Sequence, residues 1–169
     1  GQHLIDKIRA LHGGSGMSWR AWVSLIIGGL IYLEASKHLV RWTQMERPMP
    51  FMGIIPEGAQ QIVHDLGWAA VFLLVAVLVL RLNALGKTIG IIASLVMIAS
   101  AWISWDLLPG AIERQTIARR AAQGLAVRAD EIAFMQALVP ILLIVGPVVM
   151  IALFLMSYSD RPDDRRDYL

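Results

Sequence analysis

The stretch ALVPILLIVGPVVMIALFLM, residues 137–156, contains no charged or hydrogen-bonding side chain. A second block, VFLLVAVLVL at residues 71–80, is equally apolar. A surface helix of a soluble domain keeps one polar face toward water, and neither block offers such a face. About 20 apolar residues in a helix are enough to cross the ~30 Å hydrocarbon core of a bilayer. The two blocks therefore predict that acyl chains, rather than water, surround much of this protein.

The composition agrees with a membrane location and excludes several classes of function. The chain has 169 residues, of which 57% are hydrophobic, above the ~45–50% of soluble domains. The net charge is +2, and the basic residues are scattered along the chain, whereas nucleic-acid binding requires a clustered basic face. The absence of cysteine excludes disulfides, thiolate metal sites and cysteine nucleophiles.

Four segments are expected to cross the membrane as helices. The first is strongly apolar only from Ala21 to Leu33, but neither proline nor glycine interrupts its helical pattern between Leu30 and Arg47. Pro109 and Gly110 are expected to end the third helix. The short connection at 83–87 makes the second and third helices an antiparallel hairpin. We therefore predict an all-α integral membrane protein, a four-transmembrane-helix bundle with spans at about 20–42, 66–82, 88–108 and 134–156.

The remaining segments flank this transmembrane domain, which covers residues 17–157. Residues 1–16 combine a short amphipathic stripe with a linker-like Gly-Gly-Ser-Gly run. Residues 43–65 are expected to form a loop, and 111–131 an amphipathic helix that lies at the membrane interface. The charged residues 158–169 are expected to form a flexible tail.

Tryptophans and basic residues together indicate an orientation. Trp42, Trp68 and Trp105 fall at one interface if the helices alternate in direction. The opposite side holds both termini and the short loop between the second and third spans, with Arg81 and Lys87. The positive-inside rule then favours a bacterial inner membrane protein with both termini in the cytoplasm, although the outer side carries nearly as many basic residues.

One group of ionisable residues suggests chemistry. Glu34 and His38 are one helical turn apart, so both side chains can reach the same ion. The predicted topology brings further ionisable side chains to the same outer interface. A divalent metal site or a proton pathway would use Glu34, His38, His64, Asp65 and Asp106. The favoured interpretation is structural, with ion pairs along the helix and basic side chains that extend to the headgroups; no cofactor is predicted with it.

Three other patterns allow both a structural and a functional interpretation. Small residues at Gly86, Gly90, Ser94 and Ala101 allow close helix packing, either within the chain or against a partner subunit. Pro140 and Pro147 share one helix face and serve either gating or the fit of a curved helix. The basic residues Arg114, Arg119, Arg120 and Arg128 bind anionic lipid headgroups or form the solvated side of a surface helix.

No phosphate-binding loop, nucleophile elbow, His-Glu-x-x-His pair or EF-hand occurs in the sequence. The leading hypothesis is therefore a non-catalytic small membrane subunit, an accessory or scaffold protein of a larger inner-membrane complex of transporter or respiratory type. Its predicted partners are the lipid bilayer and a membrane protein. One alternative is a homo-oligomeric channel or small transporter whose path is lined by the Glu34 and His38 face. The other is a metal-dependent membrane enzyme.

Overall fold

A computed structural model of the chain describes residues 2, 5, 19–44 and 49–157, without the side chains of 38–44. The predicted segments 1–16 and 158–169 lie almost entirely outside these residues. Five helices and a short 3-10 turn make up the described chain, with no strand beyond one isolated bridge. They are α2 (Trp19–Gln44), α3 (Ala59–Leu80), α4 (Ala84–Ile103), η1 (Trp105–Leu107), α5 (Leu108–Ala122) and α6 (Ala129–Met156).

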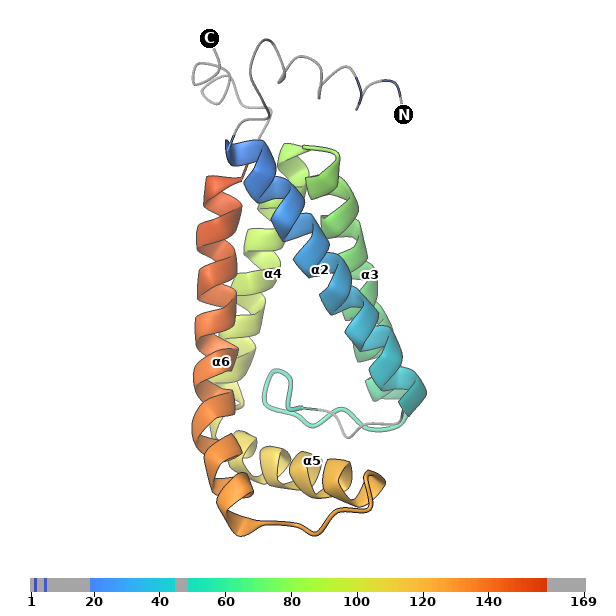
Figure 1. Cartoon of the computed structure of the whole chain (residues 1–169), viewed down its shortest axis with the longest axis vertical. Helices are drawn as coiled ribbons and strands as arrows, with labels where there is room; N and C mark the ends of the chain where they lie inside the picture. The colour runs from blue at the N-terminus through green and yellow to red at the C-terminus, as the bar shows by residue number, and fades with distance from the viewer. Residues whose placement is uncertain (1, 3–4, 6–18, 45–48, 158–169) are drawn as a thin grey trace.

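The four long helices form two pairs that diverge along the bundle. α2 packs along α3, α4 packs along α6, and α3 contacts α4 between the pairs. Figure 1 shows the pairs close together where α2 begins and α6 ends, which we call the narrow end. At the opposite, wide end the pairs spread apart, with the loop 49–58 between them and α5 lying crosswise.

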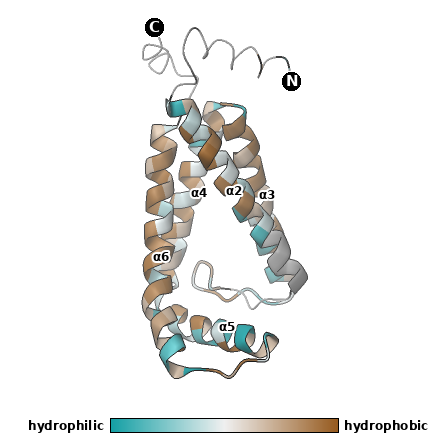
Figure 2. Ribbon diagram, in the orientation of Figure 1, coloured by the Kyte–Doolittle hydropathy of each residue, from teal (hydrophilic) through white to brown (hydrophobic). Residues whose placement is uncertain are grey.

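Three of the described helices are long and apolar enough to cross a membrane: α3, α4 and α6. Each exposes large apolar side chains on its outer side, among them Leu74, Ile92 and Val148, and most residues along these helices are coloured as hydrophobic in Figure 2. Soluble proteins seldom expose apolar patches of this extent. The chain is therefore a multi-pass, all-α membrane protein. α2, predicted as the first span, does not meet the same criterion, since Arg20, Glu34 and Lys37 interrupt its apolar sequence.

A small apolar core joins α2, α3 and α6. Ile27, Ile31 and Ala35 line one side of α2 and face Phe72 and the valines of α3. The spacing of three to four residues along α2 places these side chains on one helical face. The same cluster includes Phe154 from the last turn of α6. These contacts fix α2 to the bundle along its apolar half.

The helix boundaries differ from the predicted ones at both ends of the bundle. At the narrow end α4 begins at Ala84, so most of the predicted connection 83–87 is helical. α3 begins at Ala59 and α6 at Ala129, earlier than the predicted 66 and 134, so the loop before α3 is shorter than 43–65. The helix predicted at 111–131 ends at Ala122, because a turn follows in which Gly124 has a φ of +66°. α4 ends already at Ile103, before Pro109. Pro109 instead lies in the first turn of α5, where a missing N–H costs no helical hydrogen bond.

Candidate functional site

The loop 49–58 forms a tight turn that is hydrogen-bonded to two serines at the end of α4. Phe51 and Ile54 exchange two backbone hydrogen bonds of 2.7 and 3.0 Å. Between them Met52 and Gly53 have φ values of 47° and 81°, the left-handed conformation typical of a two-residue hairpin turn. The backbone N–H of Met52 donates to Ser100 Oγ, and that of Gly53 donates to Ser104 Oγ, each at 2.9 Å. Two buried serines of an apolar helix thus hold the loop against the bundle.

The start of α3 carries a histidine–aspartate pair beneath this loop. His64 Nδ1 lies 3.3 Å from Asp65 Oδ1, and Asp65 is only 5% exposed. The ring of Phe51 meets His64 edge to face at 4.9 Å and Trp68 at 5.8 Å. The aromatic side chain of Phe51 therefore packs against the second and third turns of α3.

An apolar groove of about 810 Å³ lies beside this pair, between α3, α4 and the loop. Among the described residues that line it, Gln60, His64 and Trp68 carry polar side-chain atoms, and none is a lysine, an arginine, an aspartate or a glutamate. Gly67 forms part of its floor, and a Cβ added there would meet nothing within 4 Å. The groove is therefore an apolar surface with one histidine at its margin.

The structure brings together two of the residues predicted for a metal or proton site. Besides the pair of His64 and Asp65, Glu34 makes an ion pair of 3.3 Å with Lys37 at the surface of α2. Asp106 is exposed in η1, and the side chain of His38 lies outside the described residues. Among the described side chains, no three histidines or carboxylates are grouped closely enough to hold a metal ion. The metal interpretation stays a prediction.

The small residues predicted for helix packing are buried within the chain. A Cβ at Gly86 would lie 2.7 Å from Leu78 Cβ and 2.9 Å from the backbone nitrogen of Val79, both in α3. A Cβ at Gly90 would collide with the ring of Phe154 in α6. Ser94 and Ala101 on the same helix are buried as well. In this structure the α4 stripe packs against α3 and α6.

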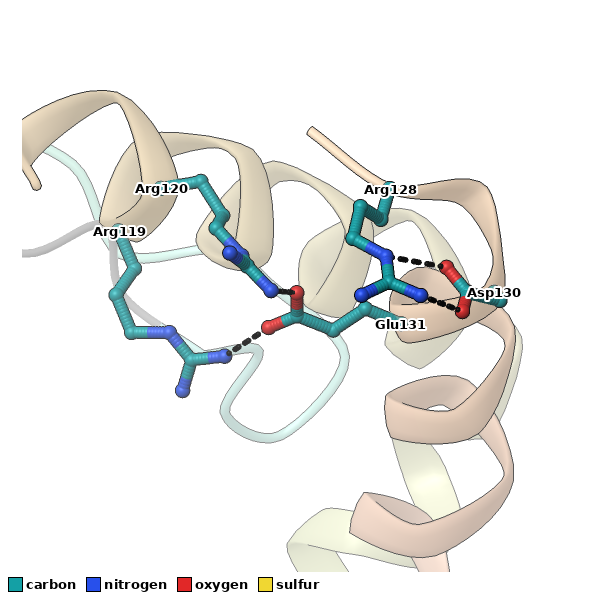
Figure 3. A network of polar contacts seen from close by, with 5 residues as sticks. All are labelled: Arg119, Arg120, Arg128, Asp130 and Glu131. Atoms are coloured by element: carbon teal, nitrogen blue, oxygen red, sulfur yellow. Dashed lines mark hydrogen bonds and ion pairs between the residues drawn. The ribbon is translucent and has the colours of Figure 1, made fainter. Parts of the chain in front are cut away.

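Three of the four arginines proposed to bind lipid headgroups have carboxylate partners at the α5–α6 elbow. Arg119 and Arg120 of α5 both donate to Glu131, and Arg128 donates to Asp130, as Figure 3 shows. The two carboxylates belong to the first turn of α6, where the helix dipole favours negative charge. These contacts link α5 to α6 across the turn 123–128. Arg114 is exposed on α5.

The two prolines of α6 lie inside one continuous helix. Pro140 and Pro147 are both buried, and the helix runs through them from Ala129 to Met156. Gln136, one turn before Pro140, donates from Nε2 to the carbonyl oxygen of Pro109 at 3.0 Å. This bond ties α6 to the start of α5, on the wide-end side of both prolines. The gating interpretation stays a prediction.

The comparisons with known proteins assign no family to this arrangement. No protein-family model, no curated protein and no solved structure matches the chain.

Proposed function

We propose that this chain is a small non-catalytic subunit of a larger complex in a bacterial inner membrane, and that α2 binds the partner. The observation that supports this is the outward face of α2. Trp22, Ile26 and Leu33 are 56%, 57% and 59% exposed on that face. The ion pair of Glu34 and Lys37, also exposed, continues it toward the wide end.

Contact with lipid alone is energetically favourable for only part of this face. Acyl chains cover the apolar side chains well, but ionisable groups at membrane depth cost ~2.5–3.5 kcal/mol on insertion scales. A partner helix with its own polar group would cover both kinds of side chain. Gly29 lies in the middle of the face, and a Cβ there would meet nothing within 4 Å. Such a gap allows the backbone of a second helix to approach closely.

This proposal includes α2 as a fourth span and both termini in the cytoplasm. α2 buries Ile27, Ile31 and Ala35 against the other helices, so it follows α3 through the apolar half of the bundle. The start of α2, the connection between α3 and α4, and the end of α6 all lie at the narrow end (Figure 1). With the narrow end inside, α5 lies at the outer interface, where its exposed arginines meet headgroups or water.

Photo-crosslinking in native membranes tests the partner surface. A photoreactive residue in place of Leu33 should give an adduct of one discrete mass with a different protein. The matched control replaces Val149, which is 49% exposed on the outer side of α6, and should give no such adduct. Gly29→Leu, which fills the gap on α2, should abolish the adduct, whereas Gly146→Leu, an equally open position on α6, should leave it unchanged.

Two results would contradict the proposal. An adduct with the mass of two copies of this chain would instead favour the homo-oligomeric channel. Equal, diffuse labelling at residues 33 and 149 would mean that lipid surrounds both helices.

A further inference from the structure

We draw no further inference here: the strongest candidate, the open apolar groove of about 810 Å³ between α3, α4 and the loop 49–58, carries none because nothing in the described part of the structure shows what covers it.

Discussion

The narrow and wide ends of this bundle are held together by different interactions. At the narrow end, Gly86 lets α4 approach the backbone of α3, and Gly90 leaves room for the ring of Phe154. Most contacts there are apolar, and Lys87 adds hydrogen bonds to the carbonyl oxygens of Leu155 and Ser157. At the wide end, Ser100 and Ser104 hold a loop by hydrogen bonds, and Glu131 pairs with two arginines. Helices inside lipid gain little from apolar burial and associate through close packing. At the wide end, where the chain approaches headgroups and water, polar contacts fix the positions of the loop and of α5. The groove beside α3 lies next to this loop.

The largest loss of stability is expected when a methyl group is added to the closely packed Gly86 at the narrow end. Gly86→Ala places a methyl group against the backbone of Val79, so the end of α3 and the start of α4 must separate. Overpacking of this kind costs about 1–3 kcal/mol, and we expect a loss of about 2 kcal/mol in the free energy of unfolding in detergent. The matched control Gly29→Ala has open space and should be neutral or slightly stabilising, since alanine favours helix. Equal stability of the two variants would contradict close packing at Gly86.

A smaller and more local effect is expected when the loop is released. Ser100→Ala with Ser104→Ala removes the acceptors of the Met52 and Gly53 amides, at about 1 kcal/mol for each hydrogen bond. Hydrogen exchange of these two amides should accelerate at least tenfold in the double variant. Ser94→Ala is the control, because among the described residues that hydroxyl donates to the Gly90 carbonyl of its own helix and does not contact the loop. Unchanged exchange in the double variant would show that the loop is held by other contacts.

The smallest change in stability is expected at the turn that joins α5 to α6. Glu131→Gln removes the charge that Arg119 and Arg120 share, but surface ion pairs contribute little to stability. The free energy of unfolding should change less than in the Ser100→Ala and Ser104→Ala double variant. The rate of amide exchange in the turn 123–128 should increase. Added salt should reduce the difference, because it screens the pairs in the unmodified chain. Asp130→Asn, whose partner Arg128 is largely exposed, should change even less.

The sequence predicts the interior of the apolar helices well and their ends less well. The apolar blocks at 71–80 and 137–156 lie within α3 and α6, because runs of this kind have few folded alternatives in lipid. The helix expected at 111–131 divides because Gly124 adopts a left-handed conformation. Helix propensity does not predict this conformation of Gly124, since glycine is tolerated inside helices at a cost of about 1 kcal/mol. Proline 109 was expected to end a helix and instead belongs to the start of one.

Side-chain partners were harder to predict than helices. His64 and Asp65 are neighbours in sequence, but adjacent side chains on a helix point in different directions, so their contact does not follow from helix formation alone. The pairing of Arg119 and Arg120 with Glu131 depends on how sharply the turn 123–128 reverses the chain, which charge spacing does not specify. The roles of Ser100 and Ser104 depend on where the loop folds back. Buried serines in an apolar helix were the one available signal, since such hydroxyls require a partner.

The four-span bundle requires that α2 crosses the membrane, and the accessibility of single cysteines measures whether it does. The chain has no cysteine, so Trp19→Cys, Asn83→Cys and Ala121→Cys each provide a unique thiol. In intact cells, an impermeant maleimide should label Cys at 121 and spare those at 19 and 83, which should react only after permeabilisation. Labelling of position 19 together with 121 in intact cells would show that α2 does not cross the membrane, and would contradict the four-span bundle.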